Sequence, residues 1–241
     1  MVIIYVIILR MKKRVLVIFG TRPEAIKMAP LVKALEKADN LQPIVCVTAQ
    51  HRGMLDQVLA SFQIKPDYDL NIMKPGQTLS AITAAAMKGI EEVILQEKPE
   101  LVLVHGDTTT AMAGALAAFY NQVKIGHVEA GLRTFDKYSP FPEEMNRQII
   151  DNLADLMFAP TKTSAENLEI KQLNAGQKIF ITGNTAIDAL KYTVSEDYKN
   201  ELFGWVGDDR MILLTAHRRE NLGQPMRDFF TALRRIVDEF A

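Results

Sequence analysis

The feature that most constrains the fold is a regular alternation of short apolar segments with segments of helical periodicity. The apolar segments after Met11 are apolar on both faces, which is typical of buried parallel strands. We expect strands at residues 15–19, 44–48, 101–104, 125–128, 156–159 and 179–181. We expect helices at residues 25–38, 54–62, 79–97, 109–120, 143–153 and 164–173. This alternation predicts an α/β fold with a doubly wound parallel sheet.

A second unit is predicted to begin near Gly183. The elements expected after it are a helix, a polar stretch, a strand and a last helix, over residues 186–194, 195–209, 211–215 and 225–240. One strand with its helices cannot cover its own apolar faces. We therefore expect residues 11–182 to form the first domain, and residues 183–241 to be the start of a second α/β domain that is truncated in this chain.

Residues 1–10 do not fit the pattern that follows them. Their apolar run, residues 2–9, is too short for the roughly 20 residues that a membrane helix needs. The positive charges follow this run instead of preceding it, so it is a poor match to a signal peptide. We expect a non-native extension, with Met11 as the natural initiator. An added edge strand or a membrane-tethering end is the alternative.

The composition excludes two classes of site. Lys and Arg number 28 and Asp and Glu number 29, so the chain has no basic excess and nucleic acid is not an expected partner. Cys46 is the single cysteine, which excludes a disulfide and a cysteine-based metal site. It lies in an apolar run, so we expect a buried, reduced thiol in a reducing, cytoplasmic compartment.

Carboxylates follow two neighbouring strands of the predicted sheet. Asp107 comes after the strand that ends at Val104, and Glu129 comes directly after the next strand. Glu143 and Glu144 open a later helix, just after Pro142. Ligands bind at the carboxyl ends of parallel strands, and carboxylates gathered there beside arginines predict a site that handles positive charge or protons.

Each carboxylate also has a structural interpretation. Asp107 can be the N-cap of the following helix. Glu129 can form a structural ion pair with Arg133, which is close by in the sequence. Glu143 and Glu144 can complement the dipole of their helix, and for Glu144 we favour this interpretation.

The turn after the first predicted strand is a candidate anion site. Gly20 permits a close backbone turn, and Pro23 suits the first position of a helix whose N–H groups attract anions. Arg22 and Lys27 can reach the same anion. An ordinary turn with two solvated cations is the alternative, and the spacing lacks the Gly-x-Gly-x-x-Gly of a dinucleotide site.

Several ordered motifs resemble the non-hydrolysing UDP-N-acetylglucosamine 2-epimerases of bacteria. They lie at residues 19–25, 48–52, 106–110, 128–134, 142–144, 183–185 and 217–221. The resemblance runs from about Met11 to the end. It implies two Rossmann-like domains of the glycosyltransferase-B type, with the active site in the cleft between them. It also implies a homodimer that interconverts UDP-N-acetylglucosamine and UDP-N-acetylmannosamine for cell-surface polysaccharide synthesis, without a metal or a nicotinamide cofactor.

The same resemblance implies roles for individual residues. The implied catalytic residues are Asp107, Glu129, Glu143 and His217, and which carboxylate removes the sugar's C2 proton stays open. The implied contacts to substrate and diphosphate are Arg22, Lys27, Arg133 and Arg218. A second, activating molecule of UDP-N-acetylglucosamine would bind at Gln50, His51 and Gln77. Surface charge is the alternative for His217 and Arg218, although we favour a position facing the interdomain cleft.

Two other functions remain open. A hydrolysing 2-epimerase would release free N-acetylmannosamine and UDP. A non-catalytic role as a sugar-nucleotide-binding fragment is the second alternative. The chain as given is expected to be inactive by itself, because the second domain would supply the uridine contacts whose binding energy positions the sugar.

Overall fold

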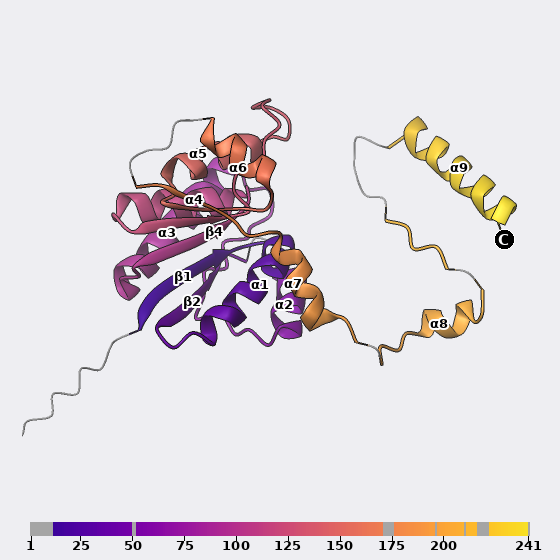
Figure 1. Cartoon of the computed structure of the whole chain (residues 1–241), viewed down its shortest axis with the longest axis horizontal. Helices are drawn as coiled ribbons and strands as arrows, with labels where there is room; N and C mark the ends of the chain where they lie inside the picture. The colour runs from indigo at the N-terminus through magenta and orange to yellow at the C-terminus, as the bar shows by residue number, and fades with distance from the viewer. Residues whose placement is uncertain are drawn as a thin grey trace, which may run out of the picture. The chain divides into compact units, whose positions relative to one another are not determined.

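The computed structural model describes residues 12–49, 52–170, 176–195, 197–209, 211–215 and 222–240. The chain divides into two units, Met1–Val194 and Ser195–Ala241 (Figure 1). The predicted extension over residues 1–10 lies outside the described residues.

The first unit is built on a seven-stranded sheet in the order β3-β2-β1-β4-β5-β6-β7, and every pair of neighbours is parallel. Its strands are β1 (Lys13–Phe19), β2 (Leu41–Val47), β3 (Tyr68–Asp69), β4 (Leu101–His105), β5 (Lys124–Val128), β6 (Leu156–Ala159) and β7 (Lys178–Ile181). The predicted strands of this unit are confirmed. Only β3, which has two residues and therefore no readable pattern, was not predicted.

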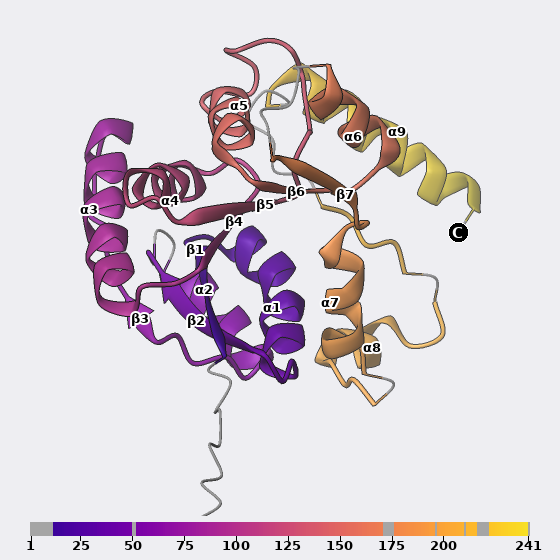
Figure 2. The ribbon, with the colours of Figure 1, turned by 60° about the vertical axis from the view of Figure 1, so that its left-hand side comes forward.

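Helices cover both faces of this sheet (Figure 2). One face packs against α1 (Arg22–Glu36), α2 (Arg52–Ser61) and α7 (Thr185–Thr193). The other face packs against α3 (Leu79–Glu97), α4 (Thr109–Tyr120), α5 (Glu143–Leu153) and α6 (Lys162–Glu169). The predicted doubly wound α/β arrangement is therefore present in the first unit.

The second unit contains α8 (Glu201–Val206) and α9 (Gln224–Phe240). The strand predicted over residues 211–215 is wrong, because these residues have no strand pairing in the structure. A strand requires a partner, and the described part of this unit offers none. Helix α8 was not predicted, since its polar surroundings suggested a loop. None of the described helices is long and apolar enough to cross a membrane.

The contacts place α7 with the first unit. Ala189 is buried in the core beneath α1, and the rings of Tyr192 and Phe62 pack with their centroids 5.6 Å apart. The division between the units therefore falls after Val194, whereas the domain boundary predicted from the sequence lies near Gly183. The earlier boundary stays a prediction about the complete protein.

The strand order reverses direction between β1 and β4, which is where open α/β sheets bind ligands. Gly20 follows β1 at this point and packs against Thr48 and Thr110, whose hydroxyl oxygens are 2.9 Å apart. A Cβ on Gly20 would lie 2.1 Å from Thr48 Oγ1. Glycine is therefore required here for close packing of the turns that follow β1, β2 and β4.

Candidate active site

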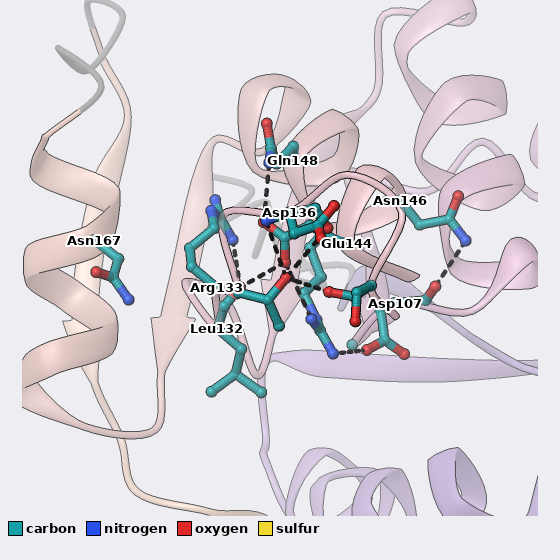
Figure 3. Close-up of polar contacts among 12 residues, drawn as sticks. Asp107, Leu132, Arg133, Asp136, Glu144, Asn146, Gln148 and Asn167 are labelled. Atoms are coloured by element: carbon teal, nitrogen blue, oxygen red, sulfur yellow. Dashed lines mark hydrogen bonds and ion pairs between the residues drawn. The ribbon is translucent and has the colours of Figure 1, made fainter. Parts of the chain in front are cut away.

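Asp107 lies in the turn between β4 and α4 and faces α5. Its carboxylate pairs with the guanidinium of Arg147, and its carbonyl oxygen accepts a hydrogen bond from Asn146 Nδ2 at 2.8 Å (Figure 3). The N-cap interpretation of Asp107 is wrong, because Thr108 is the N-cap and accepts from Ala111 N at 3.0 Å. The Asp107 carboxylate is thus available for chemistry rather than used in capping.

Glu129 directly follows β5 and has a backbone conformation that residues other than glycine seldom adopt. Its φ of 66° lies in the left-handed region, and this conformation costs a non-glycine residue about 1–3 kcal/mol. Residues strained in this way cluster at functional sites. Its Oε1 lies 2.5 Å from Lys27 Nζ, and its Oε2 lies 3.4 Å from His105 Nε2. The alternative interpretation, a structural ion pair with Arg133, is wrong, because Lys27 on α1 is the partner.

His105 is the last residue of β4 and is buried as a neutral ring. Burial is the main cause that lowers its pKa from 6.5 to about 3, and the charges of Lys27 and His127 contribute to the same shift. Its Nε2 has no aligned hydrogen bond among the described residues, although Glu129 is near. A neutral nitrogen therefore borders the Glu129 carboxylate.

Replacing His105 with Gln is expected to flatten the acid side of the stability profile. The unfolded chain binds a proton at the ordinary pKa of 6.5, whereas the folded chain binds it only near 3. The contribution of His105 to stability is complete above pH 6.5. Below that pH it falls by about 1.4 kcal/mol for each pH unit. Urea unfolding at several pH values from about 7 to about 5 measures this slope.

The unchanged protein and the His105→Gln variant should therefore differ in slope as well as in absolute stability. Equal slopes would mean that the His105 ring takes up a proton in the folded protein, which contradicts the neutral ring inferred here.

Glu144 is fully buried at the start of α5. Its carboxylate accepts hydrogen bonds from Thr134 N at 3.1 Å, Arg147 Nη1 at 3.3 Å and Gln148 Nε2 at 2.9 Å. Burial raises its pKa, but the hydrogen bonds from Gln148, Thr134 and Arg147 and the charge of Arg133 outweigh this, so the pKa is lowered. Glu144 lies in the first helical turn as expected, yet its main role is to anchor Arg147 and the loop before the helix.

Glu143, which precedes Glu144 in the sequence, has a different environment. It is half-buried in the first turn of α5. Among the described residues, no hydrogen bond or ion pair occupies its carboxylate. This separates Glu143 from Glu144 and leaves its carboxylate able to contact a ligand.

The anion site predicted at the first turn is partly filled by the protein itself. Glu24 accepts hydrogen bonds from the N–H groups of Gly20 and Thr21, at 3.0 Å and 2.8 Å, and from the Thr108 hydroxyl at 2.7 Å. Burial raises the pKa of Glu24, and these hydrogen bonds only reduce the shift. The two N–H groups are therefore not open to an anion. Arg22 is exposed at the same turn.

Arg133 does not face solvent. Its side chain is only 1% exposed, its Nη1 donates to the Leu132 carbonyl at 2.7 Å, and its Nη2 pairs with Asp151. Asp151 also lies 2.5 Å from His127 Nδ1. The direct diphosphate contact implied for Arg133 has no support in this arrangement, which gives the guanidinium a buried structural role.

The other predicted site residues are accounted for as follows. Gln77 is half-buried beside a hollow of about 270 Å³ lined by residues 72–77 and Ile82, and its side-chain oxygen accepts from Lys74 N. No cluster of His, Cys, Asp and Glu that could hold a metal ion occurs within the described ranges. The predicted site residues outside the described part of the chain are Gln50, His51, His217 and Arg218.

The sequence contained a signal for the residues that were missed. Glu144, Arg147, Gln148 and Asp151 recur along α5 at the spacing of one helical face, and this face points to the strand ends rather than to solvent. A polar helical face flanked by apolar positions such as Ile150 indicates a buried network. The polar residues His105 and His127 within apolar strands also indicate a buried polar network.

Comparison with known proteins assigns the family. Residues 33–241 match the sequence profile of a family described as UDP-N-acetylglucosamine 2-epimerase. The chain belongs to this family. The UDP-N-acetylglucosamine 2-epimerase of Bacillus subtilis is 61% identical over 229 residues, covering 95% of this chain and 60% of that protein. The enzyme of Escherichia coli K12 is 53% identical over 233 residues, covering 93% and 62%.

Solved structures of the UDP-N-acetylglucosamine 2-epimerase family share this fold. Staphylococcus aureus MnaA in complex with UDP superposes with a TM-score of 0.84 at 60% identity, covering 95% of this chain and 60% of that one. The Neisseria meningitidis epimerase bound to UDP-GlcNAc gives a TM-score of 0.84 at 46% identity, covering 94% and 63%. The chain therefore spans about three-fifths of the length of these relatives.

Proposed function

We propose that this chain supplies the carboxylate-bearing half of a UDP-N-acetylglucosamine 2-epimerase of the non-hydrolysing type. The observation that carries the proposal is that Asp107 and Glu129 follow the neighbouring strands β4 and β5, beside the point where the strand order reverses, and that each pairs with a cation from a different helix. Relatives crystallised with UDP-GlcNAc and with UDP support a nucleotide-sugar substrate. The second half of a glycosyltransferase-B fold would hold the uridine.

The chemistry explains why several carboxylates are needed. The C2 hydrogen of the sugar is not next to a carbonyl group, so direct removal is prohibitive. Departure of UDP from C1 builds positive charge on the ring and acidifies C2. One carboxylate then stabilises that charge while another removes the proton, as paired carboxylates do in glycoside hydrolysis. The products of this elimination are 2-acetamidoglucal and UDP, and re-addition with protonation on the opposite face inverts C2.

We infer different parts for the three candidate carboxylates from their surroundings. Asp107 and Glu129 are held in place by Arg147 and Lys27, which suits groups that must keep a fixed position near developing charge. Glu143 is half-buried and bonds to none of the described residues, which suits a group that meets its partner only when a ligand binds. Exposed Arg22 is the residue that we propose for contact with the departing diphosphate.

Solvent exchange at C2 tests the mechanism. For this experiment the chain is continued with the remaining C-terminal part of the Bacillus subtilis relative, and we call this protein the completed chain. In deuterated water it is expected to convert UDP-N-acetylglucosamine to UDP-N-acetylmannosamine that carries deuterium at C2, because the abstracted proton exchanges before re-addition. Mass spectrometry and proton NMR measure the label.

Product that keeps its hydrogen at C2 in full would exclude the elimination route. Release of free N-acetylmannosamine with UDP would instead identify a hydrolysing 2-epimerase. The 241-residue chain assayed in parallel tests whether it turns over by itself; we expect no turnover from it, and binding without turnover would match a sugar-nucleotide-binding fragment.

A further inference from the structure

His127 is fully buried on β5 between two hydrogen-bond acceptors. Its Nδ1 lies 2.5 Å from Asp151 Oδ1, and its Nε2 lies 2.7 Å from the carbonyl oxygen of Gly106. A carbonyl oxygen can only accept, so the hydrogen in that contact belongs to the ring. The protonation of Asp151 then decides which state the ring adopts.

Asp151 is an acceptor as well. Burial alone raises its pKa, but the charges and hydrogen bonds of His127 and Arg133 outweigh burial, so the pKa is lowered. Its Oδ2 pairs with the guanidinium of Arg133, which stays charged whatever the state of the His127 ring, and this pairing by itself favours the ionised carboxylate. An ionised carboxylate has no hydrogen to donate. Both ring nitrogens of His127 therefore donate, and a ring that donates from both nitrogens is an imidazolium.

The surrounding charges fit this state. Asp151 on α5 lies between the ring of His127 on β5 and the guanidinium of Arg133 in the loop that follows. His105 on the neighbouring strand is neutral, with a pKa of about 3, so it adds no competing positive charge near neutral pH. A protonated His127 ring would therefore have a carboxylate on one side and a carbonyl dipole on the other.

The carbonyl that His127 holds belongs to the turn that presents Asp107. Gly106 has a φ of 63°, its N–H donates to Val128 O at 2.9 Å, and its carbonyl accepts from His127. A Cβ on Gly106 would lie 3.4 Å from Glu129 Oε2, so the residue that precedes Asp107 lies against the Glu129 carboxylate. Rotation of the peptide between Gly106 and Asp107 would move the Asp107 carboxylate relative to Glu129.

We propose that His127 is a positioning residue in the imidazolium state, whose bond to the Gly106 carbonyl fixes the turn that carries Asp107 beside Glu129. The positioning role rests on the proposed function, because it takes these carboxylates as the reacting groups. The imidazolium state does not rest on it.

The protonation state is tested on the unchanged 241-residue chain labelled with ¹⁵N-histidine. Long-range proton–nitrogen NMR spectra distinguish a ring with two N–H groups from a neutral tautomer. At neutral pH, His127 is expected to show two protonated nitrogens, and loss of its signals in Asp151→Asn assigns them. One unprotonated nitrogen on His127 would overturn the imidazolium assignment.

A matched pair of variants tests the positioning role in the completed chain. The amide nitrogen of His127→Gln can take the place of Nε2 and still donate to Gly106, whereas that of His127→Asn can replace only Nδ1. Both remove the charge and the ring. We expect His127→Asn to lower kcat about 100-fold with little change in KM. The kcat of His127→Gln should be about tenfold higher than that of His127→Asn.

Tyr68→Phe is the control, because it removes a partly buried hydrogen bond to Glu97 elsewhere in the same unit. It should leave kcat unchanged even if stability falls. Unchanged kcat in a folded His127→Asn variant, or a larger kcat for Asn than for Gln, would overturn the positioning role. A completed chain without epimerase activity would refute the proposed function, while the NMR measurement would still decide the state of His127.

Discussion

Replacing Asp107 with Asn, or Glu129 with Gln, is expected to lower turnover of the completed chain about a hundredfold or more. Each amide keeps the shape of the side chain and removes the negative charge that we propose acts on the sugar ring. The partner cations remain, so Arg147 and Lys27 would face a neutral group at short range. Glu143→Gln should give a loss of the same order. Initial rates of UDP-N-acetylmannosamine formation at saturating substrate measure the effect.

The chain offers a matched control for these variants. Glu97 is a carboxylate of similar exposure to Asp107, at 21% against 26%, and it also pairs with an arginine, Arg14. It lies at the amino end of β4, opposite to the site, so Glu97→Gln should leave turnover unchanged. Near-normal rates for a folded Glu129→Gln variant would return Glu129 to a structural ion pair with Lys27. Glu144→Gln is unsuitable as a control, because it would disturb a fully buried network.

Replacing Gly131 with Ala is expected to destabilise the first unit by about 3 kcal/mol or more. The added Cβ would lie 2.1 Å from the backbone oxygen of Ser164 in α6, and the φ of 82° is itself unfavourable for alanine. Both problems involve backbone, which cannot move aside as a side chain can. The Gly131 carbonyl also accepts from Asn167 at 3.0 Å, so a shift of this loop would break that bond. Urea unfolding followed by circular dichroism measures the loss.

Substitutions at two other glycines distinguish the steric cause of the destabilisation from the conformational one. Gly176 has a φ of 98° with nothing within 4 Å of an added Cβ, so Gly176→Ala should show only the conformational cost, about 1 kcal/mol. Gly53 lies in α2 with open space around it, and Gly53→Ala should be neutral or stabilising. If Gly131→Ala costs no more than Gly176→Ala, the contact with α6 is not the cause.

The sequence predicted the framework of the first unit because its signals are local. Apolar strands and periodic helices carry their own patterns, and Asp107 and Glu129 lie at strand ends where a parallel sheet places ligands. The pattern failed where neighbours decide the outcome. The predicted strand over residues 211–215 has apolar residues but no pairing, and β3 is too short to have a pattern.

The partners of the site residues could not be predicted for the same reason. Glu129 has Arg133 close in sequence, yet it pairs with Lys27, 102 residues away. Arg133 instead pairs with Asp151, and this pairing depends on how α5 packs over the sheet. His217 and Arg218 lie outside the described residues, so their roles stay predictions.

Among the described residues, the hydrogen bonds and ion pairs of Asp107 and Glu129 all join residues of the first unit. The unit that carries the proposed catalytic carboxylates is therefore preorganised, and the proposed nucleotide-sugar substrate need not spend binding energy on ordering it. Under this proposal, the catalytic groups and the groups that recognise the base can vary independently during evolution. We expect that fusing this unit to a different nucleotide-binding half would change which nucleotide is accepted while leaving the C2 chemistry in place.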